Sequence, residues 1–324
     1  MSDVAREAGV SLATVSRAIN EPEKLSAETL ALVRAAVERL GYVPNLNAGS
    51  LASSRSRIVA AIVPTVSNAV FSETVDALTQ TLARGGYQLL LGQTAYRGGD
   101  EEGLVEAFLG RRVDGLVLTG TAQSPSLRAK LKRAGIPVVQ TWDLHDKPID
   151  MLVGFSNFEV GRAAAGHLIE RGHRRLGFIG AQEERSRQRL EGFRAGAAAH
   201  GLADVEVELI LPPAHMDDAG PRFAQMAARC PELSAVFCNN DMLAAAVVFE
   251  CHQRGWRIPG RMAVLGLGDL PIARAAFPRL STVEVRRGQI GARAGQMLLS
   301  RLGGEQAGPD IVDLGFEVIA RAST

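Results

Sequence analysis

Six of the seven residues from Ser11 to Arg17 carry side chains that suit contacts with a DNA duplex. Arg17 can donate two hydrogen bonds to guanine, whereas Leu12 and Ala13 offer apolar contact, for instance to the methyl group of thymine. The hydroxyl groups of this stretch are better suited to phosphate contacts and belong to Ser11, Thr14 and Ser16. The stretch therefore predicts a recognition helix that presents its amino-terminal residues to base edges.

Two short helices are expected to position these side chains. A first helix over residues 2–8 would turn Val4 and Ala8 to the same side, because residues four apart share a helical face. Gly9 can end that helix in the left-handed conformation, and Ser11 can cap the second helix with its hydroxyl group. Val15 and Ile19 are then expected to face the first helix.

A third helix is predicted between Ser26, which can act as its N-cap, and Gly41. Its apolar stripe is expected to consist of Leu30, Val33, Val37 and Leu40. Residues 1–44 thus read as a helix-turn-helix headpiece, although a plain three-helix fragment would show the same spacing. Net charge does not separate the two interpretations, because residues 1–57 hold seven basic and six acidic side chains.

The remainder of the chain, residues 58–324, alternates apolar stretches with helical patterns. The first expected strand covers 58–63 and the last 311–314, and one of the helices between them is expected over 187–200. Repeated strand–helix units call for parallel sheets covered by helices, and the number of strands favours two doubly wound sheets, an α/β fold. We expect an N-subdomain over about 58–155 plus 284–310, and a C-subdomain over about 156–283 plus 311–324.

Polar and aromatic residues gather where the predicted strands end, which is where such sheets bind ligands. Each of them alone could equally be a turn or a helix cap, so the hypothesis of a site depends on their meeting at one sheet edge. The candidates are Ser67, Asn68, Phe71, Thr94, Trp142, Arg187, Arg189, Asn240 and Asp269, with Arg185 completing a cluster of three arginines.

Several classes of function are disfavoured by composition. The three cysteines, at positions 230, 238 and 251, show no CxxC spacing, and the six histidines are scattered, so neither a disulfide framework nor a metal site is expected. No cofactor is expected, because the sequence lacks GxGxxG and P-loop motifs. The lack of a signal peptide and of a membrane-length apolar run predicts a cytoplasmic protein without a membrane partner.

The string from Asp3 to Asn20, with Gly41-Tyr-Val-Pro-Asn45 behind it, resembles the headpiece of the lactose/galactose-repressor (LacI/GalR) family. The resemblance supports DNA contacts from Ser11, Leu12, Ala13, Thr14, Ser16 and Arg17, and adds Asn20. It also implies a hinge helix and linker over 45–57, in which Asn45 and Ala48 contact DNA and Leu51 is a wedge in the minor groove. Only two residues precede Asp3, so either the start lies upstream or Ser2 is a weaker cap. Gly49 is also unusual within a hinge helix.

The larger part resembles the effector-binding core of the same family, through strings such as Arg189-Leu-Glu-Gly-Phe193 and Asn239-Asn-Asp-Met-Leu243. The resemblance implies that Arg189 and Asn240 meet polar groups of the effector. The family's Gly-[Tyr/Phe]-Asp-Asp segment reads Gly266-Leu-Gly-Asp269 here, which removes one carboxylate and keeps the arginines. These features are similar to the gluconate-operon repressor branch.

A ligand with its own negative charge is therefore expected, a sugar acid such as gluconate. Its carboxylate would pair with Arg189, and Trp142 or Phe71 would pack on its apolar face. The alternative is that the extra arginines are solvated surface charges, and a neutral sugar or a nucleobase would then be the ligand.

Together these features predict a DNA-binding repressor, not an enzyme, that leaves its operator when effector binds between the two lobes. Because no leucine heptad follows Arg321, a homodimer is expected on double-stranded operator DNA. A solute-binding protein of the periplasmic class is the alternative from another functional class.

Overall fold

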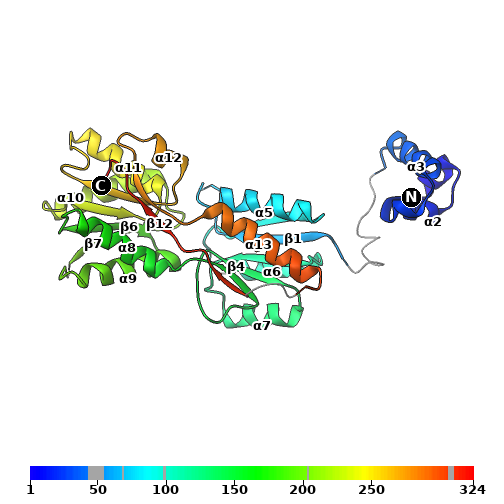
Figure 1. Ribbon diagram of the computed structural model, residues 1–324, viewed down its shortest axis with the longest axis horizontal. Coiled ribbons are helices and arrows are strands. Elements are labelled where there is room, and N and C mark those ends of the chain that lie inside the picture. Colours follow the sequence, from blue (N-terminus) through cyan, green and yellow to red (C-terminus); the bar gives the residue numbers. More distant parts are fainter. Residues whose placement is uncertain (43–54, 68, 98–99, 203, 306–309) are drawn as a thin grey trace. The chain divides into compact units, whose positions relative to one another are not determined.

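The computed structural model describes residues 1–42, 55–67, 69–97, 100–202, 204–305 and 310–324, and for Asn20 the backbone only. These residues form two compact units, Met1–Ser56 and Arg57–Thr324. We refer to the first as the headpiece and to the second as the body. Figure 1 shows the elements of both units.

The headpiece contains α1 (Ser2–Ala8), α2 (Leu12–Asn20), a 3-10 turn (Pro22–Lys24) and α3 (Ala27–Arg39). The predicted caps are confirmed. Gly9 is left-handed with φ of 64°, and the Ser11 hydroxyl accepts a hydrogen bond from the Thr14 amide at 3.1 Å. The Ser26 hydroxyl accepts in the same way from the Thr29 amide at 3.2 Å.

A small apolar core joins the three helices of the headpiece, formed by Val4, Ala5, Val15, Val33 and Ala36. Ile19 and Val37 pack against this core as partly buried residues, as the spacing predicted. Leu40 does not belong to it, because its side chain lies just past the last residue of α3 and is 45% exposed.

The first lobe of the body, the N-lobe, is built on a parallel sheet with the strand order β11-β5-β4-β3-β1-β2. Its strands are β1 (Ile58–Val63), β2 (Gln88–Gln93), β3 (Gly115–Thr119), β4 (Val138–Thr141), β5 (Met151–Gly154) and β11 (Ile311–Asp313). Its helices are α5 (Ser72–Arg84), α6 (Asp100–Gly110), α7 (Pro125–Ala134) and α13 (Arg287–Leu302). The central strands are buried apolar runs, as expected for a sheet covered on both faces.

The second lobe, the C-lobe, has the strand order β12-β10-β9-β8-β6-β7, and β12 alone runs antiparallel to its neighbour. Its strands are β6 (Leu176–Ala181), β7 (Val205–Ile210), β8 (Ala235–Cys238), β9 (Ala263–Leu267), β10 (Ser281–Glu284) and β12 (Glu317–Ile319). Its helices are α8 (Asn157–Glu170), α9 (Glu184–Ala198), α10 (Met216–Arg229), α11 (Asp241–Gln253) and α12 (Pro271–Ala275). The prediction of two doubly wound sheets is confirmed (Figure 1).

The chain passes between the lobes three times: after β5, after β10 and after β11. The third passage differs from the expected boundary. Residues 311–313 pair with β5 in the N-lobe and not with the C-lobe sheet, so the passage lies between β11 and β12. The antiparallel β12 and the five-residue α12 were not predicted, because elements of three and five residues are too short to show a period.

Close packing of α8 on α9 fixes the helix that carries the arginines. A Cβ at Gly192 would overlap the carbonyl group of Phe158, and one at Gly161 would overlap the carbonyl group of Arg189. Both glycines are therefore required for the two backbones to touch. The aromatic rings of Phe178, Phe193 and Phe237 fill the space beneath these helices.

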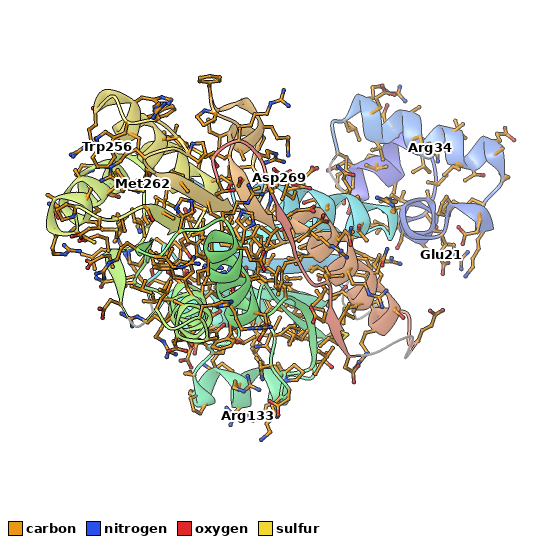
Figure 2. All side chains as sticks on the ribbon, turned by 60° about the vertical axis from the view of Figure 1, so that its left-hand side comes forward. Glu21, Arg34, Arg133, Trp256, Met262 and Asp269 are labelled. Atoms are coloured by element: carbon orange, nitrogen blue, oxygen red, sulfur yellow. The ribbon has the colours of Figure 1, made fainter. Side chains whose placement is uncertain are left out.

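No helix among the described residues is both long and apolar enough to cross a membrane. The three cysteines are free thiols in the C-lobe interior. Figure 2 shows Trp256 and Met262 in this lobe, where the guanidinium group of Arg261 lies 4.3 Å from the centre of the Trp256 ring.

Candidate functional site

Helix α2 presents the residues predicted to read DNA on its solvent side. Leu12, Ala13 and Arg17 are exposed, and the Leu12 side chain is 53% accessible although it is large and apolar. Val15, on the opposite side, is fully buried in the headpiece core. The amphipathic helix thus separates a packing face from a face available to a partner.

The hydroxyl residues of α2 lie at its amino-terminal end. The Ser11 hydroxyl lies 2.9 Å from the Thr14 hydroxyl, in addition to capping the Thr14 amide. Thr14 and Ser16 are half-buried. A helix N-terminus with hydroxyl groups beside it is suited to phosphate, because its first backbone amides point toward the anion. The predicted DNA contacts of the Asn20 side chain, Asn45, Ala48 and Leu51 lie outside the described residues, as does the effector candidate Asn68.

Helix α9 positions the arginines of the body. It begins at Glu184, and the Glu183 carboxylate caps it by accepting a hydrogen bond from the Ser186 amide at 2.9 Å. Residues four apart share a face, so Arg185 and Arg189 both point inward and are 7% and 5% exposed. Arg187 lies on the other side of the helix.

Arg189 is held by three partners in the interior. Its Nε donates to Asn239 Oδ1 at 2.7 Å, and its Nη1 donates to Asn157 Oδ1 at 2.6 Å. Its Nη2 lies 3.3 Å from Glu183 Oε1. Burial lowers the pKa of Arg189 to about 10, partly offset by the negative charge of Glu183. The guanidinium group is therefore still charged at neutral pH, and it has fixed orientation.

Arg185 is equally buried but has fewer partners. Its Nε lies 3.1 Å from Glu183 Oε2, and its guanidinium carbon lies 5.3 Å from the centre of the Phe71 ring in the N-lobe. Its Nη1 is buried and forms no hydrogen bond with any part of the chain that the structure describes. A buried unpaired donor on a cation is costly, so this nitrogen is a candidate donor to a ligand oxygen.

The N-lobe contributes an aromatic wall opposite the arginines. Phe71 and Trp142 meet edge to face with ring centres 4.9 Å apart, and both side chains are buried. Trp142 has a left-handed backbone with φ of 69°, and its indole nitrogen has no partner within the described chain. Burial raises the pKa of the nearby Tyr96 phenol, against the opposing effect of the Arg185 charge. A positive φ at a non-glycine residue is typical of functional sites.

Two hollows lie at this junction of the lobes. The larger has a volume of about 320 Å³ and the smaller one of about 30 Å³. Small-molecule sites usually start at roughly 300 Å³, and about 30 Å³ is the share of one water molecule. The larger hollow, which we call the cleft, is therefore the one with room for a metabolite in this conformation.

The predicted effector residues divide between these hollows. Thr94 lines the cleft, whereas Phe71, Trp142, Arg189 and Asn240 line the small hollow. Tyr96, Glu183 and Arg185 line both and form the partition between them. Asn240 also caps α11, since its Oδ1 accepts from the Met242 and Leu243 amides at 3.0 Å each.

Three predicted residues lie away from both hollows. Arg187 is exposed and pairs with Glu184 and Glu191 on the outside of α9, so the interpretation of this arginine as a solvated charge is the correct one. Ser67 is exposed and its amide donates to the Thr65 hydroxyl.

Asp269, labelled in Figure 2, has φ of 47° and pairs with Arg274 and Arg321 at 2.7 Å each. We therefore remove Ser67, Arg187 and Asp269 from the proposed effector site.

Sequence reasoning missed two groups of the site, Glu183 and Asn157. Glu183 pairs with both buried arginines, and Asn157 donates to Asp143 at 3.2 Å while accepting from Arg189. Asp143 also accepts from the Thr121 hydroxyl at 2.6 Å. One signal was available in the sequence. Arg185 and Arg189 are four residues apart, so they share one face of a helix that begins, as α9 does, at Glu184.

The cleft also contains a carboxylic acid that is partly buried. Glu101 lines it and accepts a hydrogen bond from Gln123 Nε2 at 3.2 Å. Burial raises the pKa of Glu101. Together with Thr94, Thr121 and Asp143, it gives the N-lobe wall the donors and acceptors that bind hydroxyl groups.

The comparisons with known proteins agree with this geometry. Residues 1–45 match the model of bacterial regulatory proteins of the lacI family, and residues 165–324 match a periplasmic binding protein-like domain. The helix-turn-helix transcriptional regulator GntR of Pseudomonas aeruginosa is 39% identical over the whole of this chain and 95% of its own. The regulator of the same name from Escherichia coli is 33% identical over 98% of this chain and 96% of its own.

Solved structures show the same arrangement. A lacI-family transcriptional regulator from Silicibacter pomeroyi has a TM-score of 0.92 and 32% identity, covering 99% of this chain and 98% of that one. The transcription regulator GntR from Chromobacterium violaceum has a TM-score of 0.79 and 36% identity, covering 82% of this chain and 98% of that one. The headpiece match separates the chain from solute-binding proteins of similar core fold. The chain therefore belongs to the lacI family of bacterial regulatory proteins and is a DNA-binding transcriptional regulator, not an enzyme.

Proposed function

We propose that this regulator is a repressor that leaves its operator when a sugar acid of the gluconate type binds in the cleft. The observation that carries the proposal is Arg185, a buried cation that lines the cleft and whose Nη1 lacks any partner in the described chain, with the buried Arg189 one helical turn away. A carboxylate is the ligand group that guanidinium nitrogens bind best at a buried site.

The remaining polar groups of the cleft suit the hydroxyl groups of such a molecule. Thr94 and Arg97 can donate, and Asp143 and Glu101 can accept, all from the N-lobe. Arg185 and Glu183 face them from the C-lobe. A ligand that touched both walls would favour one arrangement of the lobes over others, which is the requirement for coupling to DNA binding.

The direct test uses full-length protein and duplexes selected by it from a random library. Addition of D-gluconate is expected to release the selected duplex, whereas D-glucitol, which has an uncharged hydroxymethyl group in place of the carboxylate, is expected to have little effect. Fluorescence anisotropy of a labelled duplex measures both. Release by a neutral sugar or a nucleobase, with gluconate inactive, would refute the sugar-acid proposal and leave the family assignment intact.

We further propose that the repressor binds DNA as a homodimer, with two α2 helices in successive major grooves of a pseudopalindrome. Arg17→Ala is expected to lower the preference for selected over random duplex by about tenfold to a hundredfold for each half-site, because each bidentate base contact contributes about 1–3 kcal/mol and the homodimer makes two. Arg6→Ala, on the exposed side of α1, is the matched control. Unchanged preference in Arg17→Ala would remove this residue from base reading.

A further inference from the structure

One carboxylate of the site already occupies the position that an effector carboxylate would need. Glu183 lines both the cleft and the small hollow, and its side chain is 13% exposed. Its Oε2 lies 3.1 Å from Arg185 Nε, and its Oε1 lies 3.3 Å from Arg189 Nη2. Glu183 is thus the anion that both buried arginines share in this structure.

Local structure explains why this carboxylate is held inside. Glu183 is the N-cap of α9, and it accepts from the amides of Ser186 at 2.9 Å and Arg185 at 3.3 Å. Serine, threonine, aspartate and asparagine are the usual residues at such a position. As the N-cap, Glu183 therefore places a full negative charge on the side of α9 from which Arg185 and Arg189 project. Two buried cations require such a negative charge nearby.

The donors on the two arginines are almost fully used. Nε and Nη1 of Arg189 donate hydrogen bonds to Asn239 and Asn157, and the remaining nitrogen, Nη2, donates to Glu183. Nε of Arg185 donates a hydrogen bond to Glu183, whereas Nη1 has no hydrogen-bond partner in the described chain. A carboxylate that binds Arg189 through two nitrogens must therefore displace at least one of its present partners, whereas one that binds Arg185 at Nη1 joins a guanidinium group that Glu183 already neutralises through Nε.

We propose that Glu183 is an internal competitor for the effector's carboxylate, which holds the arginines in the ligand-free protein and weakens the binding of anions. The inference rests on the proposed function, since it concerns the same arginines. An entering anion is repelled by the negative charge of Glu183 and competes with it for the positive charge of the same two arginines. An uncharged polyol is not repelled by Glu183 and does not compete with it for the arginines. The affinity of the regulator for a sugar acid is consequently set by Glu183 and not by the arginines alone.

Removal of the charge of Glu183 tests this proposal. Glu183→Gln keeps an oxygen that can accept from the Ser186 amide, so the helix cap is preserved. Isothermal titration of full-length protein is expected to show about tenfold or more tighter binding of D-gluconate, because like charges a few ångströms apart interact strongly at a partly buried site. Binding of D-glucitol should change by a much smaller factor. Glu191→Gln, an exposed acid on the same helix, is the control and should match the wild type.

A second variant, Glu183→Ser, also removes the negative charge and places a good N-cap residue at this position. It should bind D-gluconate more tightly than the wild type, as Glu183→Gln should. Equal or weaker gluconate binding in both variants, relative to the wild type, would overturn the proposal and make Glu183 a structural or ligand-holding residue.

If the wild type binds no gluconate, the proposed function fails, and sulfate decides the inference on its own. Millimolar sulfate should then raise the melting temperature of Glu183→Gln more than that of the wild type or Glu191→Gln. An equal rise in all three would overturn it.

Discussion

The headpiece and the body carry their function on opposite kinds of side chain. In the headpiece the proposed contact residues are exposed, as in Leu12 and Arg17, and the described part of this unit has a small core of five buried apolar residues. In the body the proposed effector groups are buried charges, Arg185 and Arg189, that are held by Glu183 and two asparagines. Contact residues of the headpiece can therefore be exchanged at little cost in stability, whereas those of the body are also part of its interior.

Arg189→Met should show the largest effect. It leaves the oxygens of Asn239 and Asn157 without donors and Glu183 with one cation fewer, so the body is expected to lose about 3–5 kcal/mol in free energy of unfolding. Urea unfolding of the full-length chain measures it. Arg187→Met, on the outer side of the same helix, should show no measurable change, and a similar loss in both variants would contradict the difference between buried and exposed charges.

Gly192→Ala should come next. The added methyl group overlaps the carbonyl group of Phe158, so α9 must move from α8 at a cost of about 1–3 kcal/mol. Because α9 carries both arginines, gluconate affinity should fall as well. Gly166→Ala on α8 has open space around it and is expected to leave both properties intact or to raise stability slightly. An unaltered melting temperature in Gly192→Ala would show that the helix contact tolerates displacement.

Ser11→Ala should show the smallest effect and be confined to the headpiece. Loss of the cap on α2 should cost about 1 kcal/mol of headpiece stability, while Ser11→Gly should cost only a few tenths. Hydrogen exchange followed by mass spectrometry on the full-length chain can resolve headpiece amides from body amides. Faster exchange in the body would contradict the description of two separate units.

The headpiece could be predicted almost residue by residue because its signals are local. The cap at Ser11, the left-handed Gly9 and the four-residue spacing of Val15 and Ile19 each involve neighbours in sequence. The main strands of the body were predictable for the same reason, since buried parallel strands are continuous apolar runs. The short β12 depends on pairing with β10, about 35 residues earlier, and leaves no pattern of its own.

The effector site could be predicted only in part, and the failures have a common origin. The predicted start of the arginine helix at 187 was three residues late, because a glutamate cap was not considered at Glu183. Without the correct start, inward and outward arginines could not be told apart. Asp269 could not be excluded either, because one of its partners, Arg321, lies 52 residues further along the chain.

The last two strands have a consequence for how the body is held together. β11 is an edge strand of the N-lobe sheet, and β12, only a few residues later, is an edge strand of the C-lobe sheet. The short segment that contains β11 and β12 therefore covers one edge of each sheet, and its loss would expose a strand edge on both lobes. Neither lobe can be excised as a single continuous stretch of chain, so the body is expected to melt in one cooperative step despite its two sheets.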